Sequence, residues 1–173
     1  RESQIVQALI EAAESGKEVV ALVELRARFD EQNNIDWSKQ LEEAGCTILY
    51  GFDDYKVHSK LTLITKKGPQ GYSYITQIGT GNYNEKTSEL YTDYSFITAD
   101  LGIGEEASNV FQNLAVQKLT EITEKMLVAP LRFKSVLLDE MDRVINAAKL
   151  GRPASMILKN NSISDRDIIL KLE

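Results

Sequence analysis

The only histidine of the chain, His58, lies two residues after Lys56 and two residues before Lys60. The pattern over 57–65 predicts a strand, on which residues two apart face the same side. An imidazole beside two ammonium groups should favour its neutral form, because a nearby like charge disfavours protonation. Neutral imidazole is a nucleophile, and ammonium groups stabilise charge that develops during phosphoryl transfer. The pattern fits attack on phosphorus; taken alone, it also fits a half-exposed strand histidine flanked by solvated lysines.

A glycine-rich segment follows the next predicted strand. Gly79 and Gly81 free the backbone to approach a ligand, while Thr80 and Asn82 can donate hydrogen bonds to an anion. Lys86 adds a positive charge. An ordinary glycine turn at the end of a strand is the alternative, but the order of the two motifs on neighbouring strands favours a phosphate site. We therefore expect four side chains to converge on one concave site at adjacent strand ends: His58, Lys60, Thr80 and Asn82.

The elements that would position these residues follow from apolar spacing. Helical spacing over 5–13 and 35–44, with stops at Gly16 and Gly45, alternates with strand patterns over 19–23 and 46–50, which is typical of a parallel α/β sheet. The run at 19–23 predicts a strand buried on both faces. Further strands are expected at 57–65, 72–78 and 94–98, with a hairpin turn at 66–71. Two helical patterns follow residue 105, and then a strand at 154–158 and a helix from 164 onward.

Size and composition predict one folded domain and the beginning of another. The 173 residues, 43% hydrophobic and 27% charged, are typical of a globular protein. We place a catalytic domain at 1–150 and the truncated start of a following domain at 151–173. The chain begins without Met, which we interpret as a piece cut from a longer protein.

The remaining bulk properties exclude several classes of protein. A net charge of −6 disfavours a general nucleic-acid grip, although a local basic cleft would still bind a polyanion. Cys46 is the only cysteine, which argues against a disulfide scaffold and suits the cytosol. No uncharged apolar run approaches the roughly 20 residues of a membrane-spanning helix, so we expect no integral membrane contact.

The motif order resembles the phospholipase D superfamily, whose signature is H-x-K-x4-D followed by G-S-x-N. In that superfamily the histidine attacks a phosphorus centre. This chain departs from the signature, since Thr65 occupies the aspartate position and Thr80 replaces the serine. The missing aspartate argues against a phosphodiesterase of the usual kind.

The polyphosphate kinase family is a closer match over essentially the whole chain. Four stretches carry the resemblance, in order and spacing: 23–31, 56–61, 78–87 and 90–100. The resemblance implies a phospholipase D-like α/β fold, with a mixed sheet flanked by helices. It also implies reversible transfer of the γ-phosphate of ATP to inorganic polyphosphate, with Mg²⁺ as cofactor.

Individual roles are implied by the same resemblance. His58 falls on the family's phosphorylated histidine, Tyr91 on a nucleotide-binding tyrosine, and Arg28 on an arginine of the magnesium and phosphate site. Arginine carries no acceptor atom, so we expect Arg28 to clamp phosphate oxygens near the metal. Lys60 would assist catalysis, and Lys56 would join the phosphate-binding set. Without the resemblance, core packing would be the preferred interpretation of Tyr91.

Part of the family's active site lies outside this chain, including a companion arginine and the second histidine domain. We therefore expect the fragment to be poorly active alone. We expect the intact enzyme to be cytoplasmic and homo-oligomeric, with membrane association left open. The alternatives are a phospholipase D-like phosphodiesterase or nuclease, and an inactive fragment that binds polyanion or serves in assembly.

Overall fold

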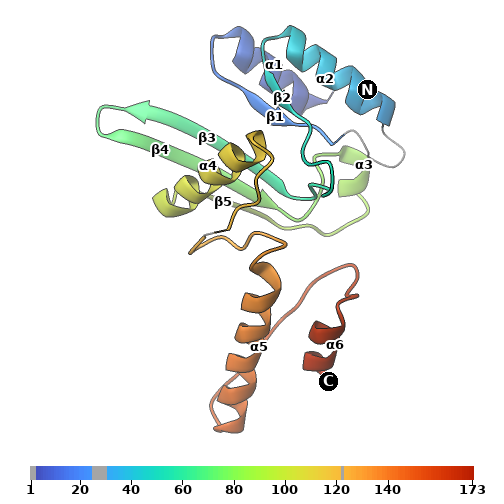
Figure 1. Cartoon of the computed structure of the whole chain (residues 1–173), viewed down its shortest axis with the longest axis vertical. Coiled ribbons are helices and arrows are strands. Elements are labelled where there is room, and N and C mark those ends of the chain that lie inside the picture. Colours follow the sequence, from blue (N-terminus) through green and yellow to red (C-terminus); the bar gives the residue numbers. More distant parts are fainter. Residues whose placement is uncertain (1–2, 25–30, 122) are drawn as a thin grey trace. The chain divides into compact units, whose positions relative to one another are not determined.

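The computed structural model describes residues 3–24, 31–121 and 123–173. It divides into two units, Arg1–Leu119 and Thr120–Glu173, which we describe separately (Figure 1). The first unit contains α1 (Gln4–Glu14), β1 (Val20–Leu22), α2 (Glu31–Glu43), β2 (Thr47–Leu49), β3 (Lys60–Gly68), β4 (Gly71–Gly79), α3 (Glu85–Ser88), β5 (Ser95–Thr98) and α4 (Leu101–Ala115). The second contains α5 (Phe133–Lys149) and α6 (Arg166–Leu172).

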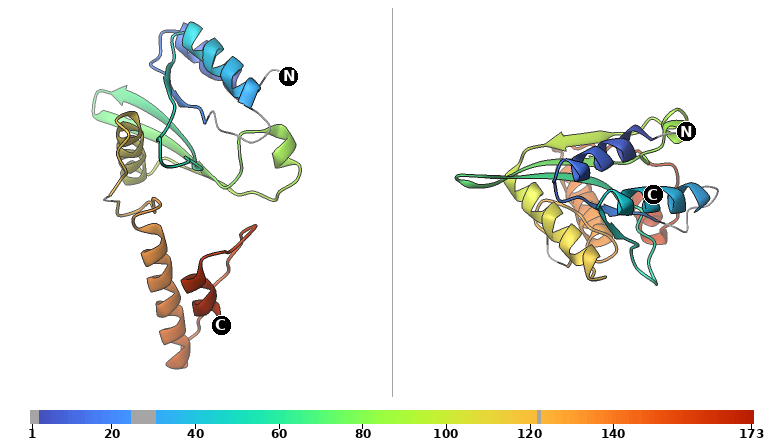
Figure 2. Two further views of the ribbon diagram at one scale, coloured as in Figure 1. Left: turned by 45° about the vertical axis from the view of Figure 1, so that its right-hand side comes forward. Right: turned by 90° about the horizontal axis from the view of Figure 1, so that it is seen from above.

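The first α/β layer joins α1 and α2 to a short parallel pair of strands (Figure 2). Its core consists of Val19, Leu41 and Cys46, against which apolar side chains of α1 pack. β1 pairs with β2 in parallel, with Val20 opposite Thr47. Val20 itself remains 39% exposed, so the described residues do not bury this strand on both faces as the sequence suggested. The alternation of helix and parallel strand is confirmed.

Both predicted glycine stops end a helix. Gly16 and Gly45 have φ angles of 83° and 93°, in the left-handed region that favours glycine. After Gly45 the backbone N–H of Cys46 donates to the carbonyl of Leu41 at 2.9 Å, which satisfies an end carbonyl of α2. The glycine reverses the chain and sends it directly into β2.

β3 and β4 form an antiparallel hairpin whose register fixes the site described below. Lys60 lies opposite Gly79, and the pairing continues to Gly68 opposite Gly71. The turn between the strands is therefore shorter than the expected 66–71. β5 adds to the open edge of β4, also antiparallel, with Ser95 opposite Gly79. Among the described residues, this antiparallel sheet is separate from the parallel β1–β2 pair.

Helix α4 covers one face of the hairpin (Figure 1). Three of its buried residues recur at intervals of three, Gly104, Ala107 and Val110, and form the face that packs on the sheet. Gly104 approaches β4 so closely that an added Cβ would lie 2.3 Å from the Cβ of Tyr74. The absence of a side chain at residue 104 therefore sets the distance between this helix and the sheet.

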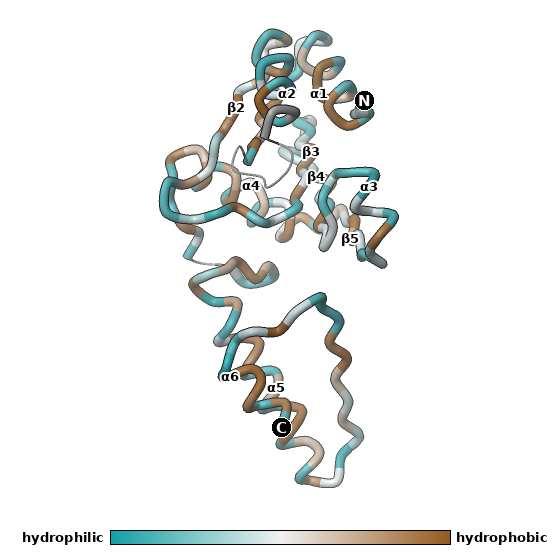
Figure 3. The backbone as a smooth tube through the Cα atoms, turned by 90° about the vertical axis from the view of Figure 1, so that its right-hand side faces the viewer, coloured by the Kyte–Doolittle hydropathy of each residue, from teal (hydrophilic) through white to brown (hydrophobic). Residues whose placement is uncertain are grey.

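The second unit begins at Thr120, and the domain boundary after residue 150 that the sequence suggested stays a prediction. Its two helices are joined by ion pairs, with Lys171 Nζ 2.6 Å from Asp142 and Lys134 Nζ 2.8 Å from Asp165. These contacts place α5 with the C-terminal residues. The expected strand at 154–158 does not form: these residues pair with no other strand among the described residues, and Ile157 is 93% exposed. Figure 3 shows the hydropathy of this connection between α5 and α6.

The contact at Gly104 yields a test of the packing of α4. Gly104→Ala should destabilise the chain by about 1–2 kcal/mol, because overpacking costs roughly 1–3 kcal/mol and the higher helix propensity of alanine returns up to about 1 kcal/mol. Urea unfolding of the 173-residue chain measures the difference. The matched control is Glu105→Ala, at an exposed position of the same helix, which should change stability by no more than about 0.5 kcal/mol. Equal effects of the two variants would contradict the close approach.

Candidate functional site

His58 lies in the irregular segment before β3, not on the strand that the pattern over 57–65 predicted. β3 begins only at Lys60, because its partner β4 ends at Gly79, the residue opposite Lys60. Beyond Gly79 the chain turns toward β5, and the N–H of Thr80 donates to the carbonyl of Tyr94 at 3.0 Å. His58 is therefore placed at the end of the hairpin, two residues beyond its last pair.

Lys60 is the buried cation of the site, with 8% of its surface exposed. Its Nζ donates a hydrogen bond of 2.5 Å to the backbone carbonyl of His58, so the described contacts do join these two predicted residues. Burial lowers the pKa of Lys60, the carboxylate of Asp93 raises it, and the charge of Lys56 lowers it again. Burial and Lys56 thus disfavour the charged form of Lys60, and Asp93 favours it.

The pKa of His58 lies below its ordinary value. Partial burial is the leading cause, followed by the charges of Lys60 and Lys56. Sequence reasoning expected the same direction but named only the lysines. Residue 58 as a whole is exposed, so its imidazole combines access with a preference for the neutral form. That combination suits a nucleophile near neutral pH.

Thr80 and Gly81 are engaged by Asp93 rather than left open. Thr80 Oγ1 donates to Asp93 Oδ1 at 2.9 Å and accepts from the backbone N–H of Tyr94 at 2.9 Å. A hydroxyl has one proton to donate, so Thr80 would have to release Asp93 before donating to an anion. A Cβ added to Gly81 would lie 2.0 Å from Asp93 Oδ2. The glycine therefore makes room for the chain's own carboxylate, and anion binding by Thr80 stays a prediction.

A row of hydrogen bonds crosses the sheet beside these residues. Tyr83 OH donates to Gln77 Oε1, so the 2.7 Å contact between Thr62 Oγ1 and Tyr83 OH has threonine as its donor. Gln77 Nε2 continues the row to Ser95 Oγ at 3.0 Å. The row ties β3, β4, β5 and the segment after Gly81 together. Sequence reasoning gave these side chains no role, although strand alternation places Gln77 on the face of Gly79.

The other predicted residues lie on the segment between β4 and β5 or before β3. Asn82 is exposed, and its carbonyl accepts from the N–H of Asn84 at 2.8 Å. Lys86 lies in α3, and Tyr91 follows that helix with 55% of its surface exposed. That exposure does not support the alternative of core packing for Tyr91 within the described residues. Lys56 is exposed, and Arg28 lies outside the described residues.

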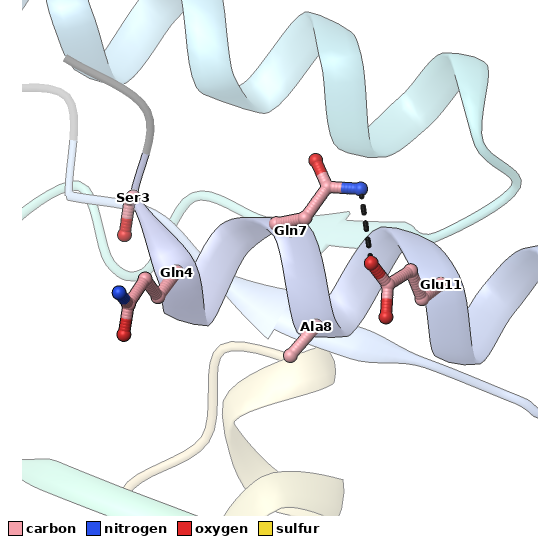
Figure 4. A pocket seen from close by; sticks show the side chains of 5 residues that line it. All are labelled: Ser3, Gln4, Gln7, Ala8 and Glu11. Atoms are coloured by element: carbon pink, nitrogen blue, oxygen red, sulfur yellow. Dashed lines mark hydrogen bonds between the residues drawn. The ribbon is translucent and has the colours of Figure 1, made fainter.

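Two pockets of the described chain do not include His58. One, of about 340 Å³, lies along α1 (Figure 4) and is lined by Ser3, Gln4, Gln7, Ala8 and Glu11. The other, of about 310 Å³, is lined by Phe52, Asp53, Asp54, Tyr55, Gln117 and Leu119. The expectation that the predicted residues share a concave site accordingly stays a prediction, and the candidate site rests on side-chain contacts.

The described residues do not form a metal cage. Within the ranges 3–24, 31–121 and 123–173, no three side chains of histidine, cysteine, aspartate or glutamate are grouped to hold an ion. Magnesium prefers oxygen ligands and is commonly bound through one or two carboxylates together with substrate phosphates. None of the described helices is both long and apolar enough to span a membrane.

Comparison with known families matches both parts of the chain. The protein-family model "Polyphosphate kinase C-terminal domain 1" matches residues 1–120, and the family model "Polyphosphate kinase C-terminal domain 2" matches residues 126–173. The second match begins close to the division between the two structural units.

Individual proteins show the same likeness. The polyphosphate kinase of Staphylococcus saprophyticus is 42% identical over 172 residues, which are 99% of this chain and 24% of that protein. The polyphosphate kinase 1 of Chlorobaculum tepidum is 43% identical, over 94% of this chain and 23% of that protein. The crystal structure of polyphosphate kinase from Porphyromonas gingivalis matches with a TM-score of 0.85 and 34% identity, over 99% of this chain and 29% of that one. The expected fold class is confirmed, and the chain spans about a quarter of the length of its curated relatives.

A titration tests the electrostatics at His58. Its pKa should fall below the ordinary value of 6.5, since burial and two like charges all favour the neutral ring. NMR of the chain measures it directly, because the only histidine needs no assignment. Lys56→Gln should raise the value by removing a like charge, whereas the control Lys39→Gln, at an exposed position of α2, should not. A midpoint above 6.5 in the unmodified chain would show that the site favours the imidazolium.

Proposed function

Because this chain belongs to the polyphosphate kinase family, we propose that its first unit carries the nucleophile that moves a phosphoryl group between ATP and inorganic polyphosphate. One geometric observation supports this most directly. His58 is exposed and favours its neutral form, while Lys60 is held against its backbone carbonyl. A nucleophile and a cation are thus fixed within one short segment.

The proposed reaction has two balanced steps. An imidazole nitrogen of His58 attacks the γ-phosphorus of ATP; an N–P bond forms, the P–O bond to ADP breaks, and ADP leaves with the electron pair. A terminal phosphate oxygen of polyphosphate then attacks the same phosphorus, and the bond to His58 breaks. Both steps are reversible, and the covalent intermediate divides one difficult transfer into two easier ones.

The chain's cations would hold the phosphates during both steps. Lys60 uses one of its three N–H donors on the carbonyl of His58, which leaves two for phosphate oxygens. Three exposed residues lie close in sequence to these strand ends: Lys56 before β3, and Asn82 and Lys86 after β4. The two lysines would add positive charge, and Asn82 would add a hydrogen-bond donor. Tyr91, also exposed, would stack on adenine, as the family resemblance implies.

Arg28 and magnesium enter the proposal through the phosphates. A planar guanidinium binds two phosphate oxygens at once, so Arg28 would clamp the donor rather than ligate metal. The ion would arrive bound to nucleotide phosphates, because the described residues form no cage for it. A cytoplasmic, self-associating enzyme remains part of the proposal on the family resemblance.

The covalent step has a direct test. The complete gene product that contains these residues should take up label from γ-labelled ATP as an acid-labile, base-stable adduct, and His58→Ala should abolish it. Ser59→Ala, which changes the exposed neighbour, is the matched control and should retain the adduct. The 173-residue chain should form it slowly or not at all, since each missing electrostatic contact costs about 10²–10³ in rate. If the alanine variant accumulates the adduct, another residue is the nucleophile. If the unmodified protein forms none, a chain that only binds polyanion is favoured.

Arg28 has a separate test in the complete gene product. Arg28→Lys keeps the positive charge but replaces a planar fork by a point charge. We expect turnover to fall by about tenfold, less than the 10²–10³ that losing an oriented donor costs. Arg152→Lys, at an exposed position of the second unit, is the matched control. Equal turnover of the two variants would assign Arg28 to the general surface charge.

A further inference from the structure

We infer that Asp93 is a positioning residue of this site: it fixes Thr80 and Gly81 at the end of β4 and balances the charge of Lys60. The structural part stands on its own, and only its effect on phosphoryl transfer rests on the proposed function. Neither the family motifs nor the sequence pattern gave Asp93 a role.

The first observation is the closed arrangement around Thr80. Its hydroxyl donates to Asp93 and accepts from the N–H of Tyr94, while its own N–H donates to the carbonyl of Tyr94. These bonds join the residue after β4 to the two residues that precede β5. Asp93 thereby determines which way the hydroxyl of Thr80 points.

The second observation is the space beside Gly81. A Cβ added to Gly81 would lie 2.0 Å from Asp93 Oδ2 and 2.5 Å from its Cγ, both too close, and 3.1 Å from its Cβ. A side chain at residue 81 would have to displace the carboxylate. Gly81 and Asp93 therefore form one packed pair, and a longer acid at residue 93 would not fit in the same place.

The third observation is electrostatic. The carboxylate of Asp93 is the opposite charge that raises the pKa of Lys60, against the lowering caused by burial and by Lys56. Without it, both remaining influences favour a neutral amine, which holds phosphate less well than an ammonium group. A carboxylate also repels a polyanionic substrate, so its place here needs a compensating role. Keeping Lys60 charged and Thr80 oriented supplies that role.

The charge-specific variant is Asp93→Asn, which keeps the shape and the acceptor for Thr80 but removes the charge. In the chain labelled with ¹³C at lysine Cε, the Lys60 signal is the one absent from Lys60→Arg. Its pKa should fall in Asp93→Asn and stay unchanged in the control Asp139→Asn, at an exposed position of α5. In the complete gene product, Asp93→Asn should slow adduct formation by about tenfold, the lower end of what removing an orienting partner costs.

Two further variants separate the outcomes. Thr80→Val removes the hydroxyl that holds Asp93 and should lower the pKa of Lys60 in the same direction, so it replaces Asp93→Asn if that variant fails to fold. In Lys60→Arg, whose guanidinium stays charged, Asp93→Asn should slow the adduct less than in the unmodified protein. An unchanged pKa of Lys60 in both folded variants overturns the inference. A lowered pKa in a protein that forms no adduct overturns the proposed function and leaves the role of Asp93 standing.

Discussion

The register of the β3–β4 hairpin is the constraint on which the site depends. Successive side chains of a strand alternate between its two faces, so a slip by one residue would move Lys60 and Thr62 away from the face that carries Gln77 and Gly79. The hairpin is pinned at its far end, where Gly68 pairs with Gly71 across a short turn. Because β4 ends opposite Lys60, residues 56–59 belong to no strand in the described part of the chain. The feature that fixes Lys60 is therefore also the one that leaves His58 outside the sheet and open to a ligand.

Gly79 and Gly81 are needed at this end of the sheet because a side chain at either residue would collide with a neighbouring polar side chain. Lys60 and Ser95 flank Gly79 from the two neighbouring strands. Because Gly79 has no side chain, only its backbone lies between them. An added Cβ there would lie 2.8 Å from Gln77 Nε2, within the row that joins Tyr83 to Ser95. Gly81 in turn makes room for Asp93. Small residues thus allow polar side chains from three strands to approach one another, which a fully substituted sheet end would prevent.

Local patterns predicted the elements better than their ends and partners. The helices α1 and α2, their glycine stops and the hairpin follow from periodicity and φ preferences, which are properties of nearby residues. The pattern over 57–65 could not show that pairing begins at Lys60, because paired and unpaired extended chains share one alternation. The strand predicted from the apolar run at 154–158 does not form, because composition alone does not show whether a segment has a partner strand. The unit boundary depends on contacts such as Lys171 with Asp142, which lie 29 residues apart. Likewise, sequence spacing does not show which acceptor the hydroxyl of Thr80 uses, so the hydrogen bond to Asp93 could not be predicted.

The exposure of the site has a consequence for chemistry. A phosphoryl group carried on an exposed imidazole is accessible to water as well as to polyphosphate, and hydrolysis would waste the intermediate. Excluding water also strengthens each interaction between the lysines and phosphate oxygens, because charges attract more strongly in a low dielectric. Within the described residues His58, Asn82 and Tyr91 are all exposed, and Ile75 and Ile97 on the hairpin sheet are 50% and 67% exposed. In the proposed reaction the first unit would supply orientation and charge, whereas a dry environment would require a further surface over these side chains. In the proposed reaction, efficient transfer to polyphosphate would depend on such a surface as well as on His58.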